Sequence, residues 1–159
     1  RRVVAEGHTL GNHTWSHKSL PELPDEAILE EIRRWDEKAL EVAGVRGRYL
    51  RPPKGEYSDR SLEVTRRAGY TTVFWSIALV DWVPMKDSRM AVTGVVDHLH
   101  NGAVILLHGN SRDVVARLPD IISGIRRAGY DIVPLDEVVG GGAGKRSGRS
   151  GAAPEVLGT

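Results

Sequence analysis

Cysteine is absent from all 159 residues, which excludes disulfide bonds, thiolate metal ligands and cysteine nucleophiles together. Neither sign of charge dominates, because 22 Lys and Arg residues nearly balance 21 Asp and Glu residues and leave a net charge of +1. This balance gives no basic surface, so we expect no nucleic-acid partner. No apolar run approaches the ~20 residues that cross a bilayer, so we expect no membrane span. The length suits one domain with a hydrophobic core.

What the chain does contain is a pair of histidines four residues apart, His13 and His17, within the segment HTWSH. A third histidine, His108, follows the apolar run 103–107. Neutral imidazole is the commonest protein ligand for zinc and the commonest general acid or base near neutral pH. A metal-dependent hydrolase needs two such groups to hold the ion and one to move protons. On spacing alone, an H-x-x-x-H pair also occurs by chance on helix faces, so both interpretations stay open here.

Stretches typical of strands and helices alternate along the chain. We expect helices over residues 23–44, 58–68, 92–99 and 113–128, and strands over 49–50, 71–75, 103–107 and 131–133. The last helix is expected to bend or restart at Pro119. The apolar run 103–107 predicts a strand buried on both faces. Alternation of this kind favours a parallel β/α fold.

One sequence, RRAGY, occurs twice, at residues 66–70 and 126–130. We expect each copy to end a helix at a left-handed glycine and then to enter a strand. Such repetition is typical of β/α units with parallel strands. Residues 139–159 are rich in Gly, Ser and Arg, so we expect a disordered tail after a domain that covers residues 1–138.

Four short segments occur in a fixed order: HTWSH at 13–17, RPPKG at 51–55, DW at 81–82 and LLH at 106–108. Together they resemble the later motifs of the polysaccharide deacetylases, the NodB homology domain of carbohydrate esterase family 4. Those motifs have the form H-(S/T)-x-x-H, R-x-P-x-G, D-W and L-x-H. The resemblance covers residues 1 to about 138. It implies an α/β fold, a distorted (β/α) barrel with its site at the C-terminal ends of the strands.

A subgroup is indicated by the segments 73–82 and 106–113. They are similar to the enzymes that deacetylate N-acetylmuramic acid in peptidoglycan, the delta-lactam-forming de-N-acetylases of the spore cortex. Ala78 stands where many relatives carry an acid, which fits that subgroup. The resemblance thus implies a hydrolase that acts on peptidoglycan glycan strands outside the cytoplasm, in the cell wall or envelope. Two alternatives stay open: a deacetylase of chitin oligosaccharides or peptidoglycan N-acetylglucosamine, and an inactive carbohydrate-binding protein.

The family's first motif, TFDDG, has no counterpart in this sequence. Its two aspartates are the family's catalytic base and third metal ligand. We therefore expect a chain that begins after this motif, a barrel that is open, and little or no activity from the chain alone. We also expect a monomer.

The resemblance assigns a role to each matching residue. His13 and His17 would hold a divalent metal, for which Zn²⁺ is the expected ion, and His108 would be the general acid. Asp81 would pair with His108, and Arg51 would orient the base. The Lys54 N–H would stabilise the oxyanion. The further loop and pocket residues implied are Pro53, Gly55, Trp82 and Leu106, of which Trp82 and Leu106 fit plain core equally well. We expect the remaining histidines, His8, His98 and His100, to be structural.

Overall fold

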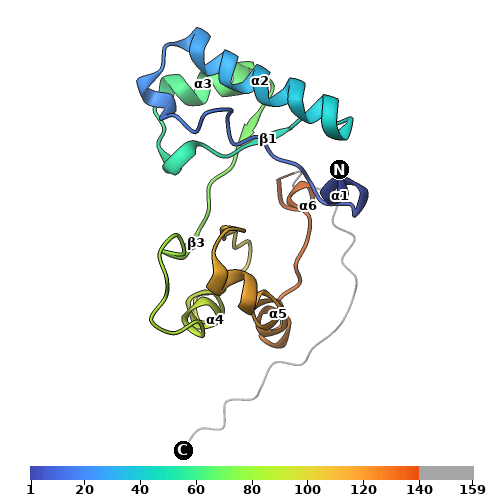
Figure 1. The fold of residues 1–159 in the computed structure, drawn as a ribbon, viewed down its shortest axis with the longest axis vertical. Helices are drawn as coiled ribbons and strands as arrows, with labels where there is room; N and C mark the ends of the chain where they lie inside the picture. Colours follow the sequence, from blue (N-terminus) through green and yellow to red (C-terminus); the bar gives the residue numbers. More distant parts are fainter. Residues whose placement is uncertain (140–159) are drawn as a thin grey trace, which may run out of the picture.

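Parallel strand pairs joined by helices organise this computed structural model, which describes residues 1–139 (Figure 1). In the first half, β1 (Tyr49–Leu50) pairs with β2 (Thr71–Thr72). The connecting helix, α3 (Asp59–Arg67), packs beside the long helix α2 (Asp25–Ala43). Asn12 adds a further parallel bridge to β1. The segment that leads to the histidine pair is therefore part of this sheet.

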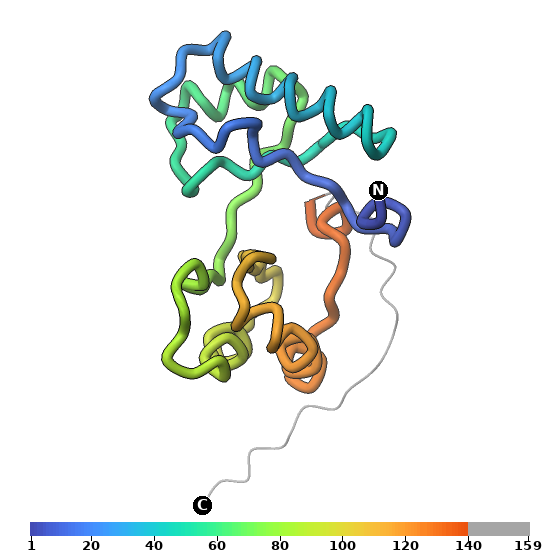
Figure 2. The backbone as a smooth tube through the Cα atoms, in the orientation of Figure 1, coloured from blue at the N-terminus to red at the C-terminus, as the bar shows by residue number. Residues whose placement is uncertain are grey.

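The second half repeats this plan. The strand β3 (Ile77–Ala78) pairs in parallel with β4 (Ile105–Leu106), and α4 (Met90–Val96) connects them. The helix α5 (Arg112–Arg127) packs against α4, and α6 (Leu135–Val139) ends the described part. Figure 2 shows the chain passing from the first half to the second after β2 and returning beside the N-terminal segment at α6. The shorter elements are α1 (Arg2–Ala5), η1 (Leu20–Glu22) and η2 (Pro53–Gly55).

Local signals explain where the helices begin and end. Ser58 and Ser61 form a reciprocal capping box at the start of α3. Gly44 ends α2 in the left-handed region, with φ of 70°. The two RRAGY copies behave alike, because Gly69 and Gly129 follow α3 and α5 with φ of 86° and 85°. The expected helix endings at these glycines are therefore confirmed.

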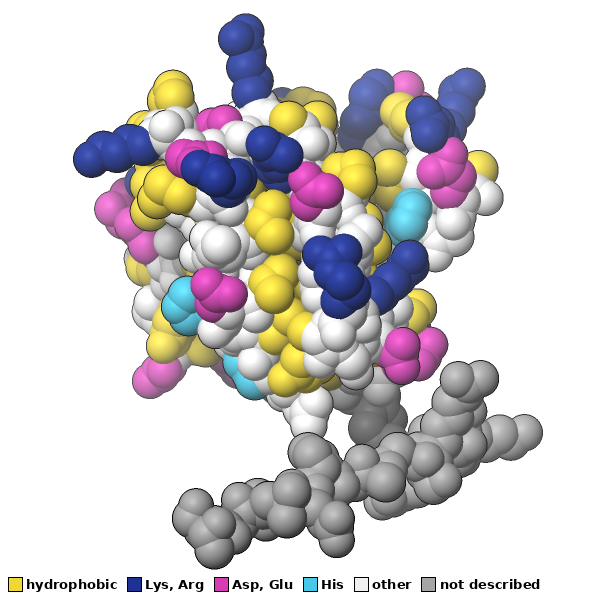
Figure 3. Space-filling model, turned by 90° about the horizontal axis from the view of Figure 1, so that it is seen from below, with side chains coloured by type: hydrophobic (Ala, Val, Ile, Leu, Met, Phe, Trp, Pro, Cys, Tyr) yellow, Lys and Arg dark blue, Asp and Glu magenta, His cyan; other side chains and the backbone are white. Residues whose placement is uncertain are grey.

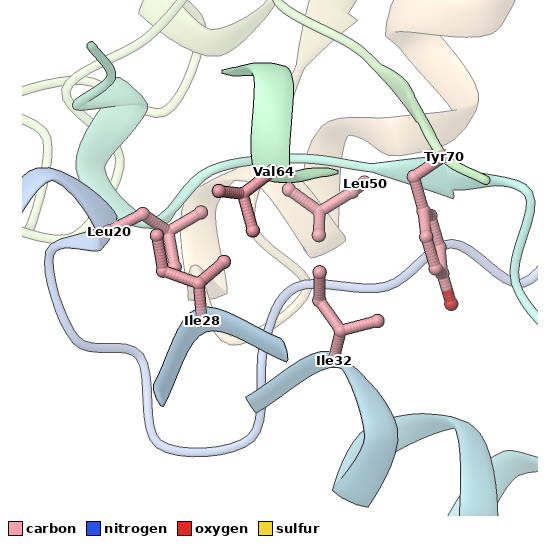
Figure 4. Packing of buried hydrophobic residues seen from close by; sticks show 6 residues of the cluster. All are labelled: Leu20, Ile28, Ile32, Leu50, Val64 and Tyr70. Carbon is pink, nitrogen blue, oxygen red and sulfur yellow. The ribbon is translucent and has the colours of Figure 1, made fainter. Parts of the chain in front are cut away.

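Each half has a hydrophobic core of its own. The first core joins η1, α2, β1, α3 and the residue before β2. Its buried members are Leu20, Ile28, Ile32, Leu50, Val64 and Tyr70 (Figure 4). The second lies between α4 and α5, and its buried members are Ala91, Val95, Val114, Ile121 and Ile125. Burial is therefore concentrated within the halves. On the surface, the face viewed from below carries a stripe of hydrophobic side chains with charged ones on both sides (Figure 3).

Polar contacts tie α6 back to the first half. The Asp136 carboxylate accepts a hydrogen bond from Arg48 at 2.6 Å and another from the Tyr49 hydroxyl. These contacts join residues that are 88 and 87 positions apart in the sequence. They hold the end of the second half beside β1.

The expected fold class is confirmed, because all the strand pairs are parallel and helices connect them. Within residues 1–139 the strands form two separate pairs, so the barrel is open. No helix of this part is both long enough and apolar enough to cross a membrane.

Several expected boundaries were wrong. The strand expected over 71–75 ends at Thr72, and the one expected over 103–107 covers only Ile105 and Leu106, which are half-buried rather than buried on both faces. Residues 131–133 form no strand in the described part, because no neighbouring strand pairs with them. Both β3 and α6 were missed.

The helix expected over 113–128 does not restart at Pro119, because α5 is one helix from Arg112 to Arg127. Val114 lies before this proline and Ile121 after it, and both are buried in the second core. Packing on both sides therefore holds α5 together despite the lost backbone hydrogen bond. The tail expected over 139–159 falls outside the described residues, except for Val139 at the end of α6.

Replacing Ile28 with alanine tests the first core. Ile28 is fully buried, so we expect the free energy of unfolding to fall by about 2–5 kcal/mol. Its neighbour Leu29 is 44% exposed, and Leu29→Ala should cost at most about 1 kcal/mol. Urea denaturation of both variants measures the difference. Equal losses would contradict the assignment of Ile28 to the core.

Candidate active site

The parallel bridge at Asn12 brings two loops together. The Asn12 N–H donates to the Tyr49 carbonyl at 2.8 Å, and the Arg51 N–H donates to the Asn12 carbonyl at 2.9 Å. Immediately beyond the bridge, His13 Nδ1 lies 2.6 Å from the Arg51 carbonyl oxygen. Because a carbonyl only accepts, Nδ1 carries the proton and Nε2 keeps its lone pair. A histidine fixed in this way is ready to bind a metal through Nε2.

His17 lies beside His13. The two ring centroids are 4.8 Å apart and the rings are nearly perpendicular, at 82°. Rings this close can direct nitrogens toward one ion. The expected pairing of these residues in space is therefore present, whereas their role as ligands remains a prediction.

Backbone strain is concentrated in the two loops. In the described part of the chain, the non-glycine residues with positive φ are Thr14 at 64°, His17 at 59° and Lys54 at 56°. A β-branched residue such as threonine is an outlier in this region. Each such residue costs on the order of 1–3 kcal/mol and persists only where its surroundings enforce it. The surroundings of both loops must therefore supply that energy.

The His13 environment favours a neutral imidazole. Burial is the main cause, and it lowers the pKa of His13 below its usual value. The nearby Arg51, His17 and His108 lower this pKa further, and the hydrogen bond to the Arg51 carbonyl only partly offsets them. The neutral form is the one that binds metals.

The second half contributes Asp81 and His108, which follow β3 and β4. Asp81 Oδ1 lies 2.6 Å from His108 Nδ1, and Oδ2 accepts the His108 backbone N–H at 2.7 Å. The Asp81 side chain has no exposed surface, and that of His108 is 32% exposed. The Trp82 ring meets the imidazole edge-on, with centroids 6.1 Å apart. One buried carboxylate thus fixes both the backbone and the ring of His108.

The loop after β1 is rigid by composition. Pro52 and Pro53 are buried, and Gly55 has a φ of 73°. A Cβ at Gly55 would lie 2.7 Å from the Trp75 ring, so only glycine fits. Among residues 1–139, no acceptor takes the Lys54 N–H. This N–H is free to meet a ligand.

Arg51 is half-buried, and burial lowers the pKa of its guanidinium. Within the described residues, no carboxylate pairs with its side chain. The same part of the chain holds no group of three or more His, Cys, Asp or Glu side chains that could bind an ion. The site therefore presents two imidazoles and an unpaired arginine.

The other residues singled out in the sequence differ in exposure and in hydrogen bonding. Trp82 is 66% exposed, so it is not core, whereas Leu106 is half-buried in β4. His98 bonds to the Gly94 carbonyl. His100 bonds to the Ser76 hydroxyl. The polar residues that support the histidine loop, chiefly Asn12 and Glu31, were not predicted from the sequence.

Comparison with known proteins agrees with this geometry. The polysaccharide deacetylase family model matches residues 1–73. A chitooligosaccharide deacetylase of Bradyrhizobium is 30% identical, over 87% of this chain and 69% of its own length. The chain belongs to the polysaccharide deacetylase family. The peptidoglycan-N-acetylmuramic acid deacetylase PdaA of Bacillus subtilis is 36% identical, over 87% of this chain and 54% of its own length.

Solved structures give the same result. The structure of Bacillus subtilis PdaA, a family 4 carbohydrate esterase, superposes with a TM-score of 0.82 at 36% identity, covering 87% of this chain and 60% of that one. A structure described as T48 deacetylase with substrate has a TM-score of 0.81 at 31% identity, covering 88% and 68%. The chain spans about half the length of the first curated relatives it matches.

Replacing Gly55 with alanine tests the tight approach of this loop to Trp75. We expect a larger loss of stability than for Gly44→Ala, because Gly44 has a similar φ of 70° but open space around its Cβ position. The control isolates the left-handed backbone cost, about 1–2 kcal/mol. Thermal unfolding of both variants measures the excess at Gly55, and indistinguishable losses would show that Trp75 moves aside freely.

Proposed function

We propose that this chain carries the metal-binding and proton-donating residues of a hydrolase that removes N-acetyl groups from amino sugars of peptidoglycan and releases acetate. The observation that carries the proposal is the presence of two pairs, His13 with His17 and Asp81 with His108, each beyond the C-terminal ends of parallel strands. The likeness to PdaA supports N-acetylmuramic acid as the sugar, and an extracytoplasmic location in the cell wall or envelope. A monomer fits the proposal.

The metal fits these residues in part. The family is generally metal-dependent. His13, with Nε2 free, and His17 would hold a divalent cation, most specifically Zn²⁺. A catalytic zinc site takes three protein ligands, so the third comes from outside residues 1–139. When bound, the ion lowers the pKa of water and polarises the amide carbonyl.

The protein's own side chains and backbone carry out the remaining steps. His108, oriented by Asp81, gives a proton to the departing amine nitrogen, which is a poor leaving group without it. The free N–H of Lys54 stabilises the oxyanion, and Pro53 and Gly55 keep that loop in place. Arg51 orients a carboxylate base that the described residues do not supply.

Three other functions have specific support. The Bradyrhizobium relative is named a chitooligosaccharide deacetylase, and a Bacillus cereus relative, 30% identical, is named a peptidoglycan-N-acetylglucosamine deacetylase. Both would use the same residues with a different sugar. The unpaired Arg51 favours a third possibility, a carbohydrate-binding protein without activity. Exposed Trp82 beside His108 would contact a sugar in each case.

Alanine substitutions separate the roles of the histidines. His13→Ala or His17→Ala should abolish zinc binding, because a single imidazole does not hold the ion. His108→Ala should leave zinc content unchanged, because its Nδ1 is committed to Asp81. Elemental analysis after dialysis measures bound zinc. Zinc retained in the His13, His17 double variant, or lost in His108→Ala, would contradict these assignments.

Acetate release from peptidoglycan glycan strands tests the function. The chain alone should release little or none, and a chimera with a TFDDG-bearing strand placed ahead of Arg1 should be active. In that chimera, His108→Ala should lower turnover by roughly 10²–10⁴-fold, the usual effect of a positioned acid. Mass spectrometry of the products identifies the deacetylated sugar. An inactive chimera that binds zinc would favour the carbohydrate-binding alternative, whereas full activity of the chain alone would show that another acid serves as base.

A further inference from the structure

The segment between the two histidines is held by side chains rather than by other backbone groups. In the described part of the chain, no backbone carbonyl accepts an N–H of residues 14–17. The Thr14 N–H donates to Asn12 Oδ1 at 2.8 Å, and the His17 N–H donates to Thr14 Oγ1 at 3.1 Å. Two N–H groups remain, and both go to one acceptor.

That acceptor is Glu31, which comes from the middle of α2. Its Oε2 accepts the N–H groups of Trp15 at 2.9 Å and Ser16 at 2.6 Å. Its Oε1 accepts the Ser16 hydroxyl, also at 2.6 Å. Glu31 is only 8% exposed, unlike its neighbour Glu30, which pairs with Arg33 on the helix surface. A buried glutamate with three donors on one short loop is not a solvent-facing helix residue.

The charge of Glu31 suits these contacts. Burial acts to raise the pKa of its carboxyl, but the hydrogen bonds from Ser16 and Trp15 outweigh burial and hold that pKa below its usual value. The ionised form accepts all three donors, and hydrogen bonds to a charged acceptor are roughly twice as strong as neutral ones. These bonds oppose the tendency of Thr14 and His17 to leave the left-handed region.

We propose that Glu31 is a positioning residue that fixes the relative placement of His13 and His17 and thereby sets the affinity of the pair for a divalent cation. The inference rests on the proposed function, because it treats the two imidazoles as metal ligands. Trp15 and Ser16 lie between them, so an anchor on both N–H groups limits how far the two rings can separate. Without the anchor, the loop can relax and the two nitrogens no longer converge.

Zinc titration of four proteins tests the inference: the unchanged chain, Glu31→Gln, Glu31→Ala and the control Glu30→Gln. Isothermal titration with ZnCl₂ gives each dissociation constant. Glu31→Ala should weaken binding by about 10–100-fold, as expected when a supporting partner of a metal ligand is removed. Glu31→Gln keeps the size of the side chain and should weaken binding by a smaller factor, about threefold to tenfold. Glu30→Gln removes the same charge from the exposed helix surface and should leave the affinity unchanged.

Ser16→Ala distinguishes geometry from charge. It removes one of the three donors without altering net charge, so a weaker zinc affinity in Ser16→Ala shows that loop geometry matters. The double variant Ser16→Ala, Glu31→Gln should lose less binding free energy for zinc than the two single variants lose in sum, because both changes act through one contact. Thermal unfolding of Glu31→Gln in the absence of zinc provides the structural readout.

The outcomes separate the two proposals. Weaker zinc binding in Glu31→Gln with an unchanged melting temperature supports the positioning role. Zinc binding that depends on His13 but is unaffected by Glu31→Gln and Ser16→Ala overturns the positioning role and leaves the metal site intact. Zinc binding that is unaffected by His13→Ala overturns the metal site itself, and the role of Glu31 with it.

Discussion

The geometry of the site depends on the hydrogen bonds of the buried Asn12 side chain. Its backbone extends the first sheet, while Nδ2 donates to the Ile32 carbonyl at 3.3 Å and to the Tyr70 hydroxyl at 3.2 Å. Its Oδ1 accepts the first N–H of the histidine loop, at Thr14. Tyr70 in turn donates to Asp36. A buried amide that loses such partners costs about 1–3 kcal/mol, so this network holds the strand, α2 and the loop in one arrangement.

The site is divided between two halves that pack separately. The first half, with its core around Leu50, supplies the histidine pair and Arg51. The second half, with its core around Ile121, supplies Asp81 and His108. The charge of His108 is among the causes that lower the pKa of His13. The proposed reaction would therefore require that the halves keep their relative placement, to which the contacts of α6 with β1 contribute.

Local sequence predicted the parts that depend on local chemistry. Short motifs predicted that Asp81 pairs with His108, and the structure contains this pair. Helical periodicity together with glycine identified the main helices. Residues 131–133 have strand-forming side chains but no strand, because pairing depends on a neighbour that local sequence does not specify. Glu31 was missed for a related reason: it stands beside Glu30 on an amphipathic helix, and its three donors come from residues 15 positions or more away. A local sequence pattern does not specify which distant residues will pair as strands or as hydrogen-bond partners.

The charges of the site indicate which part of the proposed reaction these residues would perform. His13, His17, Arg51 and His108 are all neutral or cationic, and Asp81, the carboxylate beside them, is fully buried and committed to His108. Such a set can hold a metal through neutral nitrogens, donate an N–H to an oxyanion and deliver a proton, but it has no free group to accept one from water. The half-buried guanidinium of Arg51 is the natural partner for a carboxylate base, because an arginine orients a carboxylate through paired hydrogen bonds. In the proposed function, the described residues would therefore supply the donating side of a deacetylation site, and the unpaired Arg51 would face the accepting side.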